Sequence, residues 1–202
     1  QSRYGELLAT LERLADPSQL APEAFALLSA TRAPSQLQRA GSVSLDLGPQ
    51  ARAAAAVYTA TPGSEAYFVG IADLCLARRC ADLGLSWLQE KIISPGRPAP
   101  AAAGLLRLQR SLGRAAEGLA WLEKLRPEPL SPLARLEEIY CLLATSRTSE
   151  ALTKAEGLLP LAAPAVRAEA HYLCGEALVG SYRPEEAVWH YVRALGDGYL
   201  PE

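Results

Sequence analysis

Residues 84–88, GLSWL, recur as GLAWL at residues 118–122, a shift of 34 positions. The chain holds three tryptophans, so two of them in one matching frame are hard to attribute to chance. A small residue followed by an aliphatic one returns at Ala151-Leu152 and Ala187-Val188, and the four small residues are 34, 33 and 36 positions apart. Such a period with two helices per repeat is typical of stacked helical hairpins. It predicts an all-α fold, an α-solenoid of antiparallel hairpins.

Prolines and glycines separate the apolar segments of the chain instead of interrupting them. Ser64 and Ser131 stand where N-cap residues are expected, and Pro132 and Pro184 suit the first turn of a helix. These signals place four hairpins in a region spanning residues 63–202. The expected helices are 64–77 with 80–93, 99–111 with 114–126, 131–145 with 148–159, and 165–180 with 184–196.

Residues 1–62 carry no clean repeat frame and are treated as a separate N-terminal segment. We expect helices near 3–15, 22–32 and 49–60, either as degenerate repeats or as a cap for the apolar end of the solenoid. Residues 42–47, SVSLDL, alternate polar and apolar side chains. This alternation fits a short strand, but an extended loop between helices is the preferred interpretation because no partner strand is evident.

The composition excludes several functional classes. The 202 residues are 50% hydrophobic, 21% are charged, and the formal net charge is −2, so we expect no nucleic-acid partner. No apolar run approaches the roughly 18–20 residues of a membrane span, so we expect no membrane insertion. The chain contains no methionine. We therefore expect it to be trimmed or processed, and to continue past Glu202 unless a partner covers that end.

The last repeat resembles the tetratricopeptide repeat family. The family pattern is W-x2-L-G-x2-Y, then A-x3-F, then P. Here the corresponding residues are His171-x2-Cys174-Gly175-x2-Leu178, then Ala187-x3-Tyr191, with Ala194 three further on. His171 and Cys174 depart from the usual aromatic residue and leucine, and Pro201 falls two places late. The three earlier copies lack the first-helix glycine, and all four together cover about two-thirds of the chain.

The search for catalytic and metal sites gives one weak enzymatic hypothesis. His171 and Cys174 lie at i and i+3, as a thiolate–imidazole pair requires, but no third group orients them. Metal-ligand spacings and phosphate-binding motifs are absent from the sequence, so we expect no metal and no cofactor. We interpret Glu137 and Glu138 as solvated helix surface, and His190 as facing solvent. The three tryptophans, Trp87, Trp121 and Trp189, are interpreted as core residues between hairpins.

The four cysteines do not form a disulfide framework in a chain of this length. Cys75, Cys80, Cys141 and Cys174 lie in apolar stretches, where reduced thiols behave as small hydrophobic residues. On one helix Cys75 and Cys80 would point to different sides, so a bridge between them requires a helix break. Reduced thiols favour a cytoplasmic protein, although the periplasm stays open as an alternative.

The resemblance to tetratricopeptide repeats also implies a binding surface. In that family the first helix of each hairpin lines a concave groove that holds a peptide or a partner helix. Transferred residue by residue, the groove positions are Val69, Asp73, Arg107, Arg110, Leu136, Tyr140, Leu143, Glu169, Tyr172, Glu176 and Val179. Arg and Tyr side chains are typical of protein-binding surfaces because they give a large contact area.

These observations predict a non-enzymatic scaffold or adaptor that binds a protein or peptide partner, as part of a larger complex. One alternative is a regulatory or assembly domain of a larger enzyme, transport or secretion machine. A second alternative is a thiol enzyme built on Cys174 and His171.

Overall fold

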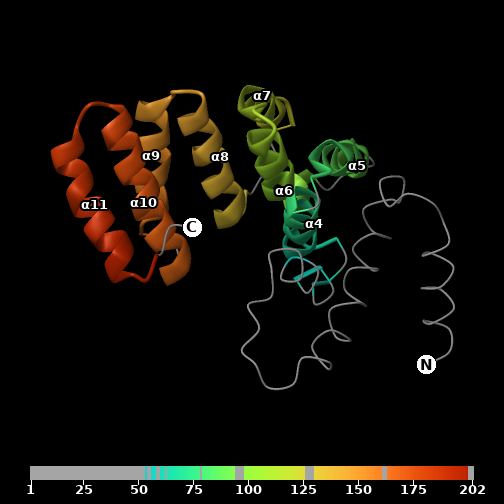
Figure 1. Ribbon diagram of the computed structural model, residues 1–202, viewed down its shortest axis with the longest axis horizontal. Coiled ribbons are helices and arrows are strands. Elements are labelled where there is room, and N and C mark those ends of the chain that lie inside the picture. The colour runs from blue at the N-terminus through green and yellow to red at the C-terminus, as the bar shows by residue number, and fades with distance from the viewer. Residues whose placement is uncertain are drawn as a thin grey trace, which may run out of the picture.

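The described part of the chain is entirely helical. The computed structural model describes residues 53, 56, 57, 60, 61, 63–77, 79–93, 98–125, 130–160 and 163–199. These residues form eight α-helices and no strand (Figure 1). The helices predicted at 3–15 and 22–32 and the extended stretch at 42–47 lie outside the described residues, as does most of 49–60.

Each helix begins and ends within one residue of its predicted bounds. The capping interactions explain this agreement: Ser64 Oγ accepts a hydrogen bond from the Tyr67 N–H at 3.2 Å, and Ser131 Oγ accepts one from the Ala134 N–H at 3.0 Å. Proline starts α6, α8, α10 and α11. The helices are α4 (Glu65–Ala77), α5 (Ala81–Ile93), α6 (Pro98–Ser111), α7 (Ala115–Leu125), α8 (Pro132–Ala144), α9 (Thr148–Leu158), α10 (Pro164–Gly180) and α11 (Pro184–Gly196).

The helices pack in a regular order. Consecutive helices pair as α4 with α5, α6 with α7, α8 with α9, and α10 with α11. The first helices of successive pairs also contact one another, α4 with α6, α6 with α8, and α8 with α10. Each second helix except α11 packs against the first helix of the next pair as well. The described chain is therefore repeat-like, with α4, α6, α8 and α10 side by side.

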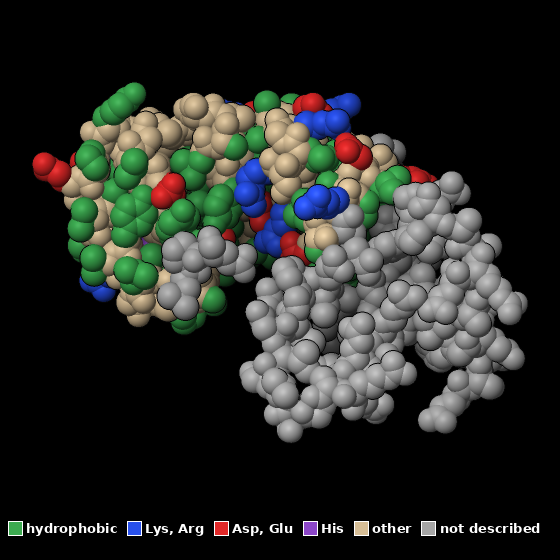
Figure 2. Space-filling view, in the orientation of Figure 1, with side chains coloured by type: hydrophobic (Ala, Val, Ile, Leu, Met, Phe, Trp, Pro, Cys, Tyr) green, Lys and Arg blue, Asp and Glu red, His purple; other side chains and the backbone are tan. Residues whose placement is uncertain are grey.

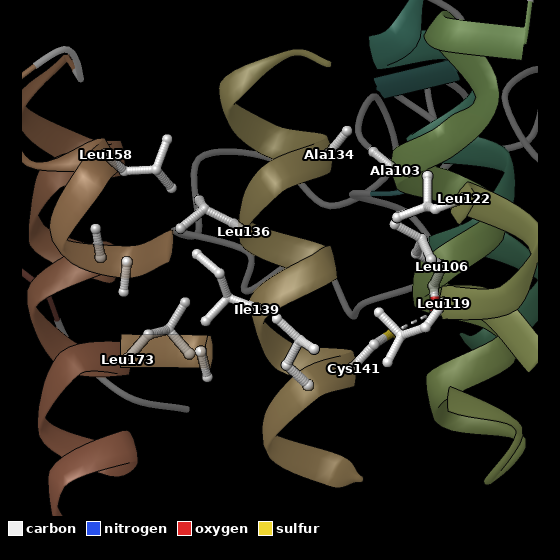
Figure 3. Packing of buried hydrophobic residues seen from close by; sticks show 14 of the residues in the cluster. Ala103, Leu106, Leu119, Leu122, Ala134, Leu136, Ile139, Cys141, Leu158 and Leu173 are labelled. Atoms are coloured by element: carbon white, nitrogen blue, oxygen red, sulfur yellow. Dashed lines mark hydrogen bonds between the residues drawn. The ribbon is translucent and has the colours of Figure 1, made fainter. Parts of the chain in front are cut away.

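The core consists of two hydrophobic clusters along this row, which lie between successive pairs and meet at α6. Leu136 and Ile139 point from α8 toward Leu158 and Leu173, whereas Cys141 points the other way, toward Leu106 on α6 (Figure 3). Helix α6 is buried on two sides, because Leu105 and Leu108 belong to the cluster around α4 and α5 while Leu106 belongs to the cluster around α8. Each pair of helices thus covers apolar surface of the next.

Candidate functional site

The turn after each first helix establishes a common register for the candidate surface. Arg79, Gly113, Ser146 and Tyr182 all adopt positive φ values between 58° and 74°, and they follow one another at 34, 33 and 36 residues. These are the spacings of the repeated small residues. Counting six residues back from each turn gives one row of equivalent positions along the four helices, occupied by Asp73, Arg107, Tyr140 and Glu176.

The other predicted groove residues fall in three further rows of the same frame. Ten residues before the turn lie Val69, Leu136 and Tyr172; three before it lie Arg110, Leu143 and Val179. Glu169 lies thirteen before it. The predicted groove residues of all four hairpins therefore keep the same register relative to the turns. We call the surface formed by these rows on α4, α6, α8 and α10 the first-helix face.

Charged side chains tie the first three of these helices together. Arg107 Nη1 donates to both carboxylate oxygens of Asp73, at 2.7 and 2.9 Å, and its Nε donates to Glu137 Oε1 at 2.7 Å. Arg110 Nη2 donates to the second oxygen of Glu137 at 3.1 Å. Two arginines on α6 therefore bridge an acid on α4 and an acid on α8. Their hydrogen bonds are charge-assisted and so belong to the stronger kind.

The network continues to α10 through an aromatic ring. The guanidinium carbon of Arg110 lies 4.5 Å from the centroid of the Tyr140 ring, a cation–π contact. The Tyr140 hydroxyl donates to Glu169 Oε1 at 2.9 Å. These side chains form a continuous chain of contacts across four helices, which we call the polar ladder: Asp73, Arg107, Glu137, Arg110, Tyr140 and Glu169. Figure 2 shows basic and acidic side chains gathered near the middle of the molecule and hydrophobic ones toward the α10 and α11 end.

Burial and neighbouring charges set the protonation states in the polar ladder. Burial lowers the pKa of Arg107, but the carboxylates of Glu137 and Asp73 outweigh it and raise the pKa overall. Burial, then the hydrogen bond with Tyr199, raises the pKa of Tyr140, so its hydroxyl is a neutral donor. Burial also raises the pKa of Glu169, against the hydrogen bond from Tyr140. The side chains of the ladder are thus paired with one another, although one buried donor, Arg110 Nε, has no hydrogen-bond partner among the described residues.

An aromatic group extends the polar ladder at α10. The ring of Tyr199, which follows α11, stacks on Tyr172 with centroids 4.8 Å apart, and its hydroxyl lies 3.5 Å from that of Tyr140. Tyr191 on α11 donates to Glu176 at 2.8 Å. The sequence analysis missed Tyr199 because it is not on a first helix. The one sequence signal for this contact was Gly198, whose φ of +90° forms a turn after α11 that brings Tyr199 toward α10.

Four predicted groove residues do not join the polar ladder or this aromatic group. Leu136 is a correction: it is 1% exposed and points into the core between α8 and α10, so a partner on this face cannot contact it (Figure 3). Val69 and Leu143 are half-buried against the same core. Val179 is exposed near the end of α10.

Three further predictions are corrected by the structure. Glu137, expected on the solvated surface, is 2% exposed because both arginines of α6 cover it. Trp189, expected in the core, is 54% exposed on α11, where no further hairpin of the described chain packs. His190, expected to face solvent, is half-buried with its Nδ1 3.2 Å from Nδ1 of His171. Trp87 and Trp121 are partly buried against the core, as predicted.

The structure does not favour a Cys174–His171 nucleophile. Cys174 is fully buried, and this burial raises the pKa of its thiol to about 12, so the thiol is protonated at neutral pH. His171 hydrogen bonds with His190 instead. Within the described residues, no group of three or more His, Cys, Asp or Glu side chains is placed to hold a metal ion.

Comparison with known proteins finds no matching family model, no similar curated protein and no similar solved structure. None of the described helices combines the length and the apolar character that a membrane span needs. The polar ladder and the aromatic group around Tyr199 are therefore the features of the first-helix face from which a function can be argued.

Proposed function

We propose that this chain is an α-solenoid similar to tetratricopeptide repeats and acts as a non-enzymatic scaffold that binds a partner polypeptide on its first-helix face. The regular contacts among α4, α6, α8 and α10 and the common turn geometry support the solenoid. The polar ladder supports the location of the binding surface, since it runs along the first helices of all four hairpins.

The observation that carries this proposal is the combination of mutual pairing and partial exposure of the side chains in the polar ladder. The side chains of Asp73, Arg107 and Arg110 are 40%, 22% and 32% exposed, although each is held by an ion pair. A partner that contacts them meets side chains already fixed in place, so binding costs little additional side-chain entropy. Tyr172 and Val179 add aromatic and apolar area beside the ladder.

A matched pair of double variants tests the proposal. Peptides are selected from a random displayed library on the purified full chain, and their affinities are measured by fluorescence anisotropy. The variant Tyr172→Ala with Val179→Asp alters the first-helix face without removing a member of the polar ladder. The control, Tyr182→Ala with Leu83→Asp, makes comparable changes at exposed positions off this face.

We expect the first-helix variant to weaken peptide binding at least about tenfold, and the control to bind as the wild type does. Thermal denaturation of both variants verifies that they fold. If the selected peptides bind both double variants equally well, the first-helix face is not the binding surface.

A second candidate function rests on a different observation. Helix α11 packs on α10 and leaves four large apolar side chains exposed together, Val188, Trp189, Val192 and Leu195. Such a patch is typical of a contact with another protein surface. A regulatory or assembly domain that positions a neighbouring part of a larger machine would use it. A photo-crosslinking residue at position 192 captures that neighbour, whereas one at position 172 captures a partner of the first-helix face.

A further inference from the structure

The turns after the first helices share a hydrogen-bond pattern that brings two side chains together. In each, the residue after the left-handed position donates its N–H to the carbonyl five residues earlier, with N···O distances of 2.7 to 2.9 Å. This is the Schellman motif, in which the side chains of these two residues meet. The pairs are Cys80 with Cys75, Arg114 with Gln109, Arg147 with Leu142, and Arg183 with Leu178.

The first turn differs from the other three by its chemistry. Arginine donates in three of the four turns, but in the first both positions of the motif are cysteines. Helix α4 ends at Ala77 and α5 begins at Ala81, so the helix break that a Cys75–Cys80 bridge needs is present. Cys80 Sγ also donates to the Cys75 carbonyl at 3.5 Å, which places the thiol over the end of α4.

We propose that Cys75 and Cys80 are a reversible redox modification site, which closes to an intramolecular disulfide by exchange with a small-molecule disulfide of the glutathione class. The backbone hydrogen bond at 2.9 Å and the contact of the Cys80 thiol with the Cys75 carbonyl at 3.5 Å hold the two residues next to each other, which a disulfide between them needs. Cys141 and Cys174 are each buried without a cysteine at the matching position of such a turn.

The exchange proceeds in two balanced steps. The thiolate of Cys80, the more exposed of the two, attacks one sulfur of oxidised glutathione and forms a mixed disulfide, releasing one glutathione thiolate. Burial, then the neighbouring Cys80, raises the pKa of the Cys75 thiol to about 12, so this second step proceeds through a small ionised fraction and is slow, but it is intramolecular. Cys75 loses its proton, attacks Cys80 Sγ, forms the Cys75–Cys80 bond and releases the second glutathione thiolate. The protein loses two electrons, which reduce glutathione disulfide, and its two thiol protons pass to the released thiolates.

The site acts on the first hairpin and stands independently of the proposed binding function. Cys75 Sγ packs against Gly84 on α5, where an added Cβ would lie 2.7 Å from the sulfur. The bond would therefore fix the turn at which α4 and α5 meet, two residues from Asp73 at the start of the polar ladder. Oxidation is expected to restrain the first hairpin while leaving the other three unchanged.

Tryptic mapping tests the proposal on the full chain. The folded protein is incubated with oxidised glutathione, remaining thiols are alkylated, and the peptides are identified by mass spectrometry. Trypsin cuts after Arg78 and Arg79, between the two cysteines, so only a disulfide can hold peptides 53–78 and 80–91 together. We expect the joined species, lighter by two hydrogens than the two reduced peptides, and its loss on reduction with dithiothreitol.

Variants separate the two steps. Cys75→Ser should stop at the glutathione adduct on Cys80, and Cys80→Arg, which reproduces the residue found in the other three turns, should show no linked peptide. The proposal is overturned if the folded wild type yields no linked peptide after incubation with oxidised glutathione, or if Cys80 accepts no glutathione in the Cys75→Ser variant. Because the wild-type map alone decides the first outcome, it does not depend on the variants folding.

Discussion

Glu137 holds the polar ladder together at the scale of single residues. Its carboxylate accepts from Arg107 on one oxygen and from Arg110 on the other, and it is the ladder's most buried acid. A buried carboxylate is tolerated where its charge is paired and its oxygens are hydrogen bonded, as they are here. Removing it leaves two arginines side by side on one face of α6 without their shared counter-charge.

We predict that Glu137→Gln lowers the free energy of unfolding by about 2 to 4 kcal/mol, since it removes the charge that both arginines use. Urea denaturation followed by circular dichroism measures the change. Glu138→Gln is the matched control, because among the described residues Glu138 makes a single ion pair, at 2.9 Å with Lys154, whose side chain is 39% exposed, and should cost about 1 kcal/mol. Equal losses in the two variants would contradict the central position assigned to Glu137.

The difference between Glu137 and Glu138 shows what the sequence could not predict at this scale. The two residues are identical and adjacent, and the helical period alone assigns both to a solvated surface. Glu137 is buried because Arg107 and Arg110 on α6 contact it, and those residues lie about 30 positions away in the sequence. The placement of Arg107 and Tyr140 at equivalent positions of successive first helices could be predicted, because a repeat frame orders positions along one helix face. Their role in binding stays a prediction.

We expect the two histidines, His171 and His190, to make stability depend on pH. Burial lowers the pKa of His171, the neighbouring His190 lowers it further, and burial lowers the pKa of His190. The unfolded chain therefore binds protons more readily than the folded chain. Their contribution to stability is complete above the ordinary histidine pKa of about 6.5 and is lost as the pH falls through it.

We predict a lower urea midpoint at pH 5.5 than at pH 7.5 in the wild type, and a smaller difference in the His171→Asn, His190→Asn double variant. Charged groups near the pair, Asp197, Arg193 and Arg167 toward His171 and Glu156 toward His190, are unchanged in this variant. The comparison therefore isolates the two imidazoles. A pH dependence identical in both proteins would exclude them as its source.

At the scale of elements, local signals were sufficient to place every described helix. Serine N-caps, N-terminal prolines and the Pro/Gly breaks act within a few residues of each helix end, and therefore they can be read without the fold. The left-handed turns are different. Arg79, Ser146 and Tyr182 adopt positive φ without being glycine, so the residue types at these positions did not predict the turns. Their common geometry follows from closure of each hairpin.

The glycines of the helices offer a test of the packing between elements. A Cβ on Gly104 of α6 would lie 2.7 Å from the backbone oxygen of Phe68 on α4, which cannot move aside as a side chain can. A Cβ on Gly157 of α9 meets nothing within 4 Å. The first glycine is therefore required by the close approach of two helices, and the second is not.

We predict that Gly104→Ala lowers the unfolding free energy by about 1 to 3 kcal/mol, the usual cost of overpacking. Gly157→Ala should leave it unchanged or raise it by about 0.5 kcal/mol, because alanine favours a helix over glycine. Urea denaturation of both variants decides the point. A stabilised Gly104→Ala would show that α4 and α6 are not in close contact.

At the scale of the whole molecule, the arrangement of the helices determines how far the destabilising effect of one substitution spreads. In a solenoid each hairpin contacts only its neighbours, and stability is a sum of repeat and nearest-neighbour terms. Helix α9 packs between α8 and α10, whereas α11 packs on α10 at one end of the described row. In a single globular core, by contrast, a destabilised helix would weaken all of the others together.

Two equivalent substitutions distinguish these arrangements. Ala151 on α9 and Ala187 on α11 are buried at the same repeat position, and leucine at either one overpacks its hairpin. We predict that Ala187→Leu speeds hydrogen exchange in α10 and α11 alone, and that Ala151→Leu speeds it in α8, α9 and α10. Exchange is followed by mass spectrometry. If Ala187→Leu speeds exchange in α4 to α7 as much as in α11, the helices form one cooperative unit, and the proposal of a solenoid with a binding face on its first helices fails.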